Sequence, residues 1–307
     1  MHSKPSQLQR KTVRLIHHAA NGSHHEPAGS LAALEYCLAS GASKIEIDVI
    51  PLVDGSFVLL HDPNLETATN GSGNVVQMTR EAVENLCYLH NGAVTNEKVG
   101  FLVDAIDLLV QSTATQVLQL DFKPYTPLTR SVLEALLKIV IPVKDRIQVS
   151  SVADWAVRAL KDAEPNLALG FDPLLYLDLV DEEPRPENIP PFRVGAYGLL
   201  DDHPLSAFQW GGLGDYFAAR AAALLAQVPA GCEWYIRADL LKIALDAGFD
   251  WIDFLHQKSS TVAGWTIDIT KPDQVQIARN LCDHGIDELT TNSPSGLAKR
   301  LDSDTIV

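Results

Sequence analysis

The sequence is poor in cysteine, and its four cysteines stand far apart. Cys37, Cys87, Cys232 and Cys282 form no Cys-x-x-Cys pair, which argues against a zinc ribbon and against a dense disulfide framework. Cys37 and Cys282 fall within apolar helical patterns, so we expect both to be thiols of the core.

Positive charge is also scarce. The chain has 24 lysines and arginines against 39 aspartates and glutamates, which gives a net charge of −15 and a pI near 5.0. Nucleic-acid-binding proteins are normally basic, so we expect no nucleic-acid partner, and the acidity also disfavours adhesion to anionic membranes. An anionic phosphate substrate would have to be met by a local charge or a metal, since the overall field repels it.

Long apolar runs are missing as well. No stretch approaches the length of a membrane-spanning helix, and residues 1–11 lack the apolar segment of a signal peptide. We therefore expect a cytoplasmic protein with no stable membrane insertion. The hydrophobic fraction of 46% and the charged fraction of 21% are those of a globular protein with a sizeable core, and the sequence shows no internal repeat or low-complexity segment.

Short apolar strands alternate with helical patterns over most of the chain. We expect strands at 13–16, 45–49, 57–60, 116–121, 146–149, 167–171, 264–268 and 288–291. Helices are expected at 31–38, 79–88, 101–111, 128–140, 153–163, 215–228, 238–247, 272–284 and from 294 onward. This alternation is typical of parallel α/β proteins. It predicts a single-domain (β/α)8 TIM barrel over 13–307, preceded by an N-terminal tail over 1–12; a doubly wound sheet is the alternative.

The alternation breaks between 172 and 214. Proline clusters at 184–186 and 190–191 exclude an interior helix or a central strand there. We predict a long surface excursion with one short strand at 194–199. The segment 251–255 could be a strand or the end of a helix, and the pattern does not decide between them.

The most informative segment is the second expected strand. Glu46 and Asp48 alternate there with Ile45, Ile47 and Val49, so the two carboxylates share one face. Two like charges side by side are costly unless a cation lies between them, and a hard cation such as Mg²⁺ or Ca²⁺ prefers oxygen ligands. Alone, such a pair is more often a solvated strand face, so the interpretation depends on what lies nearby.

Further polar residues stand where expected strands end. His17 and His18 follow the first strand, His61 follows the run after the turn at 54–55, and Asp121 and Lys123 close the next strand. Active sites of barrels are built at the carboxyl ends of the strands, where residues distant in sequence converge. We therefore expect these side chains to surround the carboxylate pair.

This convergence suggests a specific division of roles. Glu46, Asp48 and Asp121 would supply three carboxylates to a Mg²⁺ or Ca²⁺ ion. His17 and His61 would act as a proton-transfer pair, because histidine titrates near neutral pH. A lysine close by, such as Lys123, would offer a point charge to a phosphate group.

Several short motifs along the chain combine into a recognisable pattern. They are His17-His18-Ala19, Pro27-Ala28-Gly29-Ser30, Gly41-Ala42-Ser43-Lys44-Ile45-Glu46-Ile47-Asp48-Val49, Asp54-Gly55, Leu59-Leu60-His61-Asp62, Thr69-Asn70-Gly71-Ser72-Gly73, Asp121-Phe122-Lys123, Trp265-Thr266-Ile267-Asp268 and Thr291-Asn292-Ser293-Pro294. Together they resemble the glycerophosphodiester phosphodiesterase family. Its corresponding motifs are His-Arg-Gly, Pro-Glu-Asn-Thr, Gly-Ala-Asp-x-Ile-Glu-x-Asp-Val, Asp-Gly, Val-x-x-His-Asp, Thr-x-Gly-x-Gly, Glu-x-Lys, Trp-Thr-Val-Asn and Thr-Asp-x-Pro. The resemblance covers most of the chain except about 172–260.

The resemblance implies a phosphodiesterase barrel of the phosphatidylinositol-phospholipase-C-like type. It also implies a divalent metal and the hydrolysis of a small-molecule glycerophosphodiester to glycerol phosphate and an alcohol. Position by position, it makes Glu46, Asp48 and Asp121 the metal ligands. It makes His17 and His61 the catalytic acid–base pair.

On the phosphate side the resemblance is weaker. Lys123 and Trp265 are implied to bind substrate, and His18 stands at the position of the family's phosphate-binding arginine. Ala28 and Gly29 replace a glutamate and an asparagine of the family motif. These losses keep two alternatives open: a non-catalytic barrel that binds a phosphate or head group, or a hydrolase resembling lysophospholipase D or sphingomyelinase D. The sequence leaves open the head group, the metal and the oligomeric state.

Overall fold

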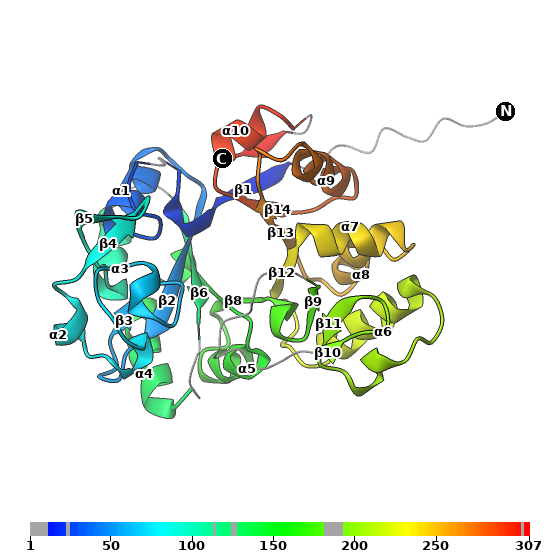
Figure 1. Ribbon diagram of the computed structural model, residues 1–307, viewed down its shortest axis with the longest axis horizontal. Coiled ribbons are helices and arrows are strands. Elements are labelled where there is room, and N and C mark those ends of the chain that lie inside the picture. Colours follow the sequence, from blue (N-terminus) through cyan, green and yellow to red (C-terminus); the bar gives the residue numbers. More distant parts are fainter. Residues whose placement is uncertain (1–11, 23–24, 113–114, 124–127, 181–192, 302–303) are drawn as a thin grey trace.

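The computed structural model describes residues 12–22, 25–112, 115–123, 128–180, 193–301 and 304–307, and it shows a ring of strands surrounded by helices (Figure 1). Within these residues eight parallel strands close into a barrel, because β1 pairs with β2 on one side and with β14 on the other. Around the ring the strands are β1 (Val13–His17), β2 (Lys44–Pro51), β6 (Val117–Phe122), β7 (Ile147–Ser151), β8 (Ala168–Phe171), β12 (Glu233–Arg237), β13 (Val262–Ile267) and β14 (Glu288–Thr291). The predicted (β/α)8 TIM barrel is confirmed, and the doubly wound sheet is excluded because the sheet is closed.

Helices connect the strands along the outside of the barrel (Figure 1). They are α1 (Leu31–Ala39), α3 (Leu102–Gln111), α4 (Arg130–Val140), α5 (Asp154–Ala163), α6 (Leu213–Leu225), α7 (Ala238–Asp246), α8 (Trp251–His256), α9 (Pro272–Asp283) and α10 (Pro294–Ala298). Ser30 begins α1 as an N-cap, since its Oγ accepts a hydrogen bond from the Ala33 N–H at 3.1 Å. In the described residues no helix combines the length and the apolarity needed to cross a bilayer. The predicted tail over 1–12 falls, except for its last residue, outside the described residues.

Alternation along the strands separates an apolar outer face from a polar inner face. In β2, Ile45 and Ile47 are fully buried between barrel and helices. Lys44, Glu46 and Asp48 face the barrel interior instead, where they meet charged residues of other strands. The predicted sharing of one face by Glu46 and Asp48 is confirmed, and that face is the inside of the barrel.

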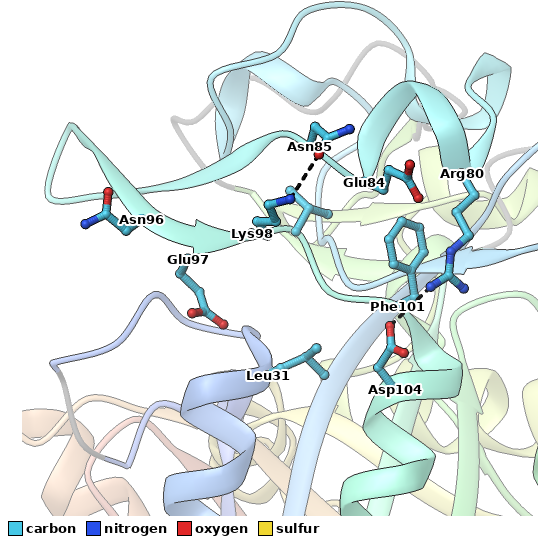
Figure 2. A pocket seen from close by; sticks show the side chains of 10 residues that line it. Leu31, Arg80, Glu84, Asn85, Asn96, Glu97, Lys98, Phe101 and Asp104 are labelled. Atoms are coloured by element: carbon cyan, nitrogen blue, oxygen red, sulfur yellow. Dashed lines mark hydrogen bonds and ion pairs between the residues drawn. The ribbon is translucent and has the colours of Figure 1, made fainter.

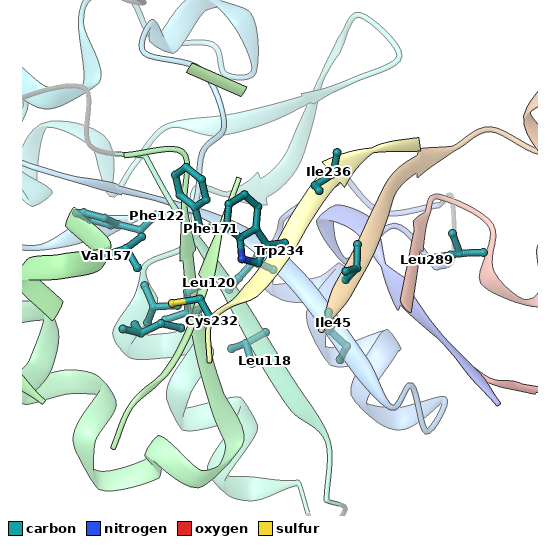
Figure 3. Close-up of a cluster of buried hydrophobic side chains, with 14 of the residues drawn as sticks. Ile45, Leu118, Leu120, Phe122, Val157, Phe171, Cys232, Trp234, Ile236 and Leu289 are labelled. Carbon is teal, nitrogen blue, oxygen red and sulfur yellow. The ribbon is translucent and has the colours of Figure 1, made fainter. Parts of the chain in front are cut away.

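The main apolar core lies between the strands and the helices (Figure 3). Phe171 of β8 and Trp234 of β12 pack edge to face there, with ring centroids 5.1 Å apart and an interplanar angle of 87°. Leu120 and Val157 belong to the same cluster. Cys37 is fully buried in this core, and Cys282 is partly buried against it, as their apolar patterns predicted.

A charged layer fills the barrel at the amino-terminal ends of its strands. The Nζ of Lys44 donates to Glu233 at 2.8 Å and to Glu288 at 2.5 Å, and Arg14 donates to Glu288 at 2.9 Å. Gln148 adds a hydrogen bond to Glu233 at 2.7 Å. Lys44 is only 2% exposed, so this network closes the barrel beneath the site described below.

The segment between β2 and α3 forms an insertion with its own small apolar cluster. It contains β3 (Phe57–Val58), α2 (Arg80–Val83) and a hairpin of β4 (Cys87–His90) and β5 (Ala93–Lys98). The helix predicted over 79–88 is therefore too long. Asn91 and Gly92 turn the hairpin with positive φ values of 50° and 77°, the combination that tight hairpins favour.

The segment between β8 and α6 is the predicted excursion, but its strands differ from the prediction. It holds a small antiparallel sheet of β9 (Leu177–Leu179), β10 (Arg193–Val194) and β11 (Leu199–Asp201). The strand predicted over 194–199 is thus two strands joined by a turn, in which Gly198 has a φ of 78°. The prolines that predicted the excursion lie at 184–191, outside the described residues.

The prediction missed one barrel strand. β12 was not recognised, and the undecided segment 251–255 belongs to helix α8. β12 begins and ends on charged residues, Glu233 and Arg237, whose partners Lys44 and Asp178 lie on distant elements. A local pattern cannot show that these charges are neutralised.

Candidate active site

A hollow of about 290 Å³ opens at the carboxyl end of the barrel. One half of its wall comes from β1, β2, β6 and the segment after β3. This half carries most of the site residues that the sequence predicted, namely His18, Glu46, Asp48, His61, Asp121 and Lys123. Trp265 lies in the other half of the wall. His17 is the predicted site residue that the structure places elsewhere.

Three carboxylates form the centre of this half. Asp48 pairs in register with Asp121 on the neighbouring strand, and Glu46 lies one step earlier on the same face. One oxygen of each carboxylate lies within 4.8 Å of the others. Burial raises the pKa of Glu46 well above its ordinary value, and the charges of Asp48 and Asp121 raise it further. A donor set of three converging carboxylates fits a hard divalent cation, which would relieve this repulsion.

Lys123 supplies the nearest positive charge to these carboxylates. Its Nζ lies 3.0 Å from Asp48 and 2.5 Å from Asp121. Burial raises the pKa of Asp48, but Lys123, His61 and His18 together outweigh burial, so that this pKa lies below its ordinary value. The structure therefore places Lys123 inside the site, where its role as a phosphate ligand stays a prediction.

The two adjacent histidines at the end of β1 face opposite sides of the strand. His18 lines the hollow, with its Nε2 4.0 Å from Glu46 and its Nδ1 2.7 Å from the Oδ1 of Asn292. His17 is 5% exposed and faces the helices, with its Nδ1 3.6 Å from the Sγ of Cys37. The expectation that His17 joins the site is therefore corrected, because strand alternation brings His18 there instead.

The surroundings of His17 also make it a weaker base than an exposed histidine. Burial lowers its pKa to about 4, so the ring is neutral near pH 7. It lines a different hollow of about 360 Å³, together with Gly22 and Ser293.

His61 lies in the hollow as predicted, just beyond β3. Its Nδ1 is 3.3 Å from Asp62, and its side chain is 59% exposed. The charge of Lys123 lowers the pKa of His61, but the hydrogen bond with Asp62 and the charge of Asp48 outweigh it and raise the pKa above the ordinary value. His61 can therefore hold a proton near neutral pH.

The other half of the wall contains residues that the sequence interpretation missed. Asp172 and Leu174 follow β8, and Tyr235 lies on β12, beside the predicted Trp265 of β13. Asp172 could have been predicted from the sequence, because it directly follows the strand expected over 167–171. Lys123 was predicted from the same kind of position, at the end of another expected strand. Tyr235 could not, because its strand was not recognised.

A separate hollow of about 600 Å³ lies between the first insertion and the barrel (Figure 2). Its floor holds Phe101, over which the guanidinium of Arg80 lies at 4.2 Å. Arg80 also lies 3.6 Å from Asp104, and Lys98 donates to Asn85 at 2.9 Å. These groups pair with one another, and the three clustered carboxylates lie elsewhere, so this hollow is not the candidate active site.

Comparisons with known proteins place the chain in a family. A profile of the Glycerophosphoryl diester phosphodiesterase family matches residues 17–295. The glycerophosphodiester phosphodiesterase of Caldanaerobacter subterraneus is 26% identical over 170 residues, which cover 54% of this chain and 67% of that protein. Glycerophosphodiester phosphodiesterase 1 of Rattus norvegicus is 36% identical over 88 residues, which cover 29% of this chain and only 26% of the rat protein.

Solved structures share the fold. A phosphodiesterase of Oleispira antarctica, determined in complex with the product sn-glycerol-3-phosphate, superposes with a TM-score of 0.64 at 18% identity and covers 95% of this chain and 98% of its own. A glycerophosphodiester phosphodiesterase of Parabacteroides distasonis has a TM-score of 0.65 at 16% identity, covering 94% of this chain and 97% of its own. At such identities the likeness shows the fold.

The barrel and the family match together define a protein of the phosphoric diester hydrolase class. More narrowly, the chain belongs to the glycerophosphoryl diester phosphodiesterase family.

Because His18 lines the hollow, a second alignment of the first motif is open. If His18 is the histidine of His-Arg-Gly, then Ala19 stands at the arginine position and Ala20 at the glycine position. Ala19 and Ala20 have φ values of 47° and 49°, left-handed conformations that glycine adopts without strain, so either alanine suits the glycine position. In both alignments the family's arginine is absent: His18 replaces it in the first and Ala19 in the second. The Ala19 N–H donates to Glu46 at 2.7 Å.

Proposed function

We propose that this protein hydrolyses a glycerophosphodiester to glycerol phosphate and an alcohol, with a divalent cation held by Glu46, Asp48 and Asp121. The observation that carries the proposal is the convergence of these three carboxylates with His18 and His61 in one hollow. The family supports the reaction, and the Oleispira antarctica structure with sn-glycerol-3-phosphate supports the product.

His18 and His61 are the proposed acid–base pair. His61 has a raised pKa and would donate a proton to the leaving alcohol. His18, oriented by Asn292, would accept a proton from the attacking group, which is water or the neighbouring glycerol hydroxyl. Bound Mg²⁺ or Ca²⁺ would supply charge stabilisation at the phosphate oxygens. Lys123 would place its ammonium against one of those oxygens.

Removal of the metal tests this proposal. The purified protein is assayed on glycerophosphocholine by the release of glycerol 3-phosphate, first as prepared, then with EDTA, then with Mg²⁺ or Ca²⁺ restored. We expect EDTA to abolish turnover and one of the cations to restore it. Glu46→Gln and Asp121→Asn should each lower kcat at least ~100-fold, since charge stabilisation at the transition state is the largest catalytic contribution.

Asp107→Asn is the matched control, because Asp107 is an exposed carboxylate of α3 far from the hollow. It removes one charge and should leave turnover unchanged. Full activity of the metal-stripped protein in EDTA, or of both Glu46→Gln and Asp121→Asn, would contradict the metal site.

A second candidate function is a barrel that binds a phosphate or head group without turnover. The absence of the family's phosphate-binding arginine, whose place is taken by His18 or Ala19, favours it, because one phosphate contact is lost. Calorimetry would then show metal-dependent binding of glycerol 3-phosphate, while a panel of short diesters and a long-chain lysolipid shows no hydrolysis. Release of alcohol from the lysolipid alone would instead indicate a lysophospholipase D-like activity.

A further inference from the structure

The two halves of the hollow differ in charge. Glu46, Asp48 and Asp121 form an acidic cluster in one half of the hollow. The same half carries three groups able to be cationic, namely Lys123, His18 and His61. The opposite half, from β7, β8, β12, β13, β14 and the segment after β8, has no basic side chain among its described lining residues and includes the aromatic rings of Tyr235 and Trp265. Among the described residues that line this opposite half, Asp172 is the single ionisable group apart from the phenol of Tyr235. A substrate whose phosphate lies at the acidic cluster would extend its substituent toward this half.

Asp172 is held firmly in place. Its backbone N–H donates to the carbonyl of Ser151 at 3.1 Å, and its Oδ1 accepts the N–H of Leu174 at 2.8 Å. The second oxygen, Oδ2, has no hydrogen-bond or ion-pair partner among the described residues. One carboxylate oxygen is therefore available to a ligand in the hollow.

Other aspartates of the same region are neutralised by arginine. Asp178 pairs with Arg237 at 2.9 Å, and Asp201 pairs with Arg220 at 2.8 Å. Asp172 has no such partner in the described chain. Burial and the charge of Asp121 raise the pKa of Asp172 well above its ordinary value, and they outweigh the opposing effects of the Leu174 N–H and the charge of Lys123. A positive charge against Oδ2 would favour the ionised form and supply the missing partner.

Two aromatic side chains belong to the same half of the hollow as Asp172. Tyr235 and Trp265 line the same hollow as Asp172. The hydroxyl of Tyr235 donates down the barrel to Gln148 at 2.7 Å, so the phenol is anchored and its ring stays at the wall. Aromatic faces together with a carboxylate form a favourable environment for an organic ammonium group.

We propose that Asp172 is a specificity residue that receives the ammonium group of a cationic alcohol, of the choline or ethanolamine type, in the diester substrate. The assignment rests on the proposed function and names the alcohol that the proposed hydrolysis releases. Tyr235 and Trp265 form the aromatic wall of the same subsite.

The test compares substrates that differ only in the charge of the alcohol. Glycerophosphocholine and glycerophosphoethanolamine carry a cation, whereas glycerophosphoglycerol is neutral there. Asp172→Asn removes the charge while keeping the shape. We expect kcat/KM to fall about tenfold for both cationic diesters, mainly because KM rises. A tenfold change corresponds to the loss of one ion pair of moderate strength. For glycerophosphoglycerol we expect a change of less than about twofold.

Two further variants separate this role from a structural one. Asp172→Glu keeps the charge and should recover part of the preference for the cationic diesters. Asp107→Asn should leave the preference unchanged. An equal fall of kcat/KM on all three diesters would place Asp172 against the glycerol moiety or the fold, and would overturn the proposal. So would an unchanged substrate preference in Asp172→Asn.

Failure of this specificity proposal can be distinguished from failure of the proposed function. If the unaltered protein hydrolyses none of the diesters with Mg²⁺ or Ca²⁺ present, the proposed function fails, and calorimetry with glycerophosphocholine and glycerophosphoglycerol decides the subsite. Tighter binding of the cationic diester by the unaltered protein, lost in Asp172→Asn, would support it. Equal binding of both would overturn it.

Discussion

At the scale of single residues, position decides what a side chain can do. His17 and His18 are neighbours of the same type at the end of β1, and yet only His18 enters the hollow. His17 is enclosed beside Cys37, where burial lowers its pKa to about 4. The sequence predicted a histidine at this point of the site, and the direction of the strand's alternation selects which one.

Substitution of each histidine tests this distinction. His18→Ala should lower kcat ~100-fold or more, because a general acid or base typically contributes that much. His17→Gln should leave kcat for the folded protein nearly unchanged. Both variants are assayed on glycerophosphocholine at pH 7.5 after a check of their folding by circular dichroism. The opposite ranking of the two variants would restore His17 to the catalytic pair.

His17 also predicts a pH dependence of stability. The unfolded chain takes up a proton at His17 near pH 6.5, whereas the folded chain does so only near pH 4. Between these values the unfolded state binds more protons, so the free energy of unfolding falls as the pH falls, by up to about 3 kcal/mol. Above pH 6.5 this contribution is constant.

His17→Gln removes this contribution. Urea unfolding of both proteins at pH 8 and pH 4.5 measures it, since other titrating groups cancel in the comparison. The unaltered protein should lose about 2–3 kcal/mol more than the variant between the two pH values. An equal loss in both would show that His17 is not the buried neutral group described.

At the scale of elements, strands with one clear apolar face were predicted and strands with distant charge partners were not. β2 and β6 carry regular alternation, so their carboxylates were placed correctly. β12 starts at Glu233, whose cation partner Lys44 lies 189 residues away in the sequence. Because this strand was not predicted, Tyr235 was also missed as a residue of the opposite wall.

Close packing between β8 and β12 gives a prediction at this scale. A Cβ on Gly170 would lie 2.5 Å from the Tyr235 ring and 3.0 Å from the Cβ of Ser150. Gly170→Ala should therefore displace Tyr235, lower the free energy of unfolding by ~1–3 kcal/mol and raise KM, because that ring lines the hollow. Gly212→Ala is the control, since its Cβ meets only Asp215, at 3.4 Å. Unchanged stability and KM in Gly170→Ala would contradict the packing.

At the scale of the whole molecule, barrel closure brings charges together at both ends. At the carboxyl end it gathers the acidic cluster and its histidines. At the amino-terminal end it gathers Lys44, Glu233 and Glu288, which are nearly inaccessible to solvent. The net charge of −15 repels a phosphate, so the proposed phosphate binding would depend on the few cationic groups that closure places in the hollow.

Breaking the buried network at the amino-terminal end should destabilise the barrel. Lys44→Met leaves Glu233 and Glu288 facing each other without their shared cation. We expect a loss of ~3–5 kcal/mol in the free energy of unfolding, measured by urea denaturation, because an unpaired charge stays buried. Lys138→Met, on an exposed position of α4, should change it by less than about 0.5 kcal/mol. If Lys44→Met unfolds like the unaltered protein, the network does not stabilise the barrel.

The sequence by itself determined the class of fold, the shared face of Glu46 and Asp48, and the convergence of Asp121, Lys123 and His61 with them. Those features follow from periodicity within single elements and from the rule that strand ends meet in a barrel. Only the tertiary structure decided that His18 and not His17 lines the hollow, and that Asp172 and Tyr235 belong to the opposite wall. The reason is physical: which face of a strand points inward, and which distant group neutralises a charge, depend on pairings between elements that no local pattern contains.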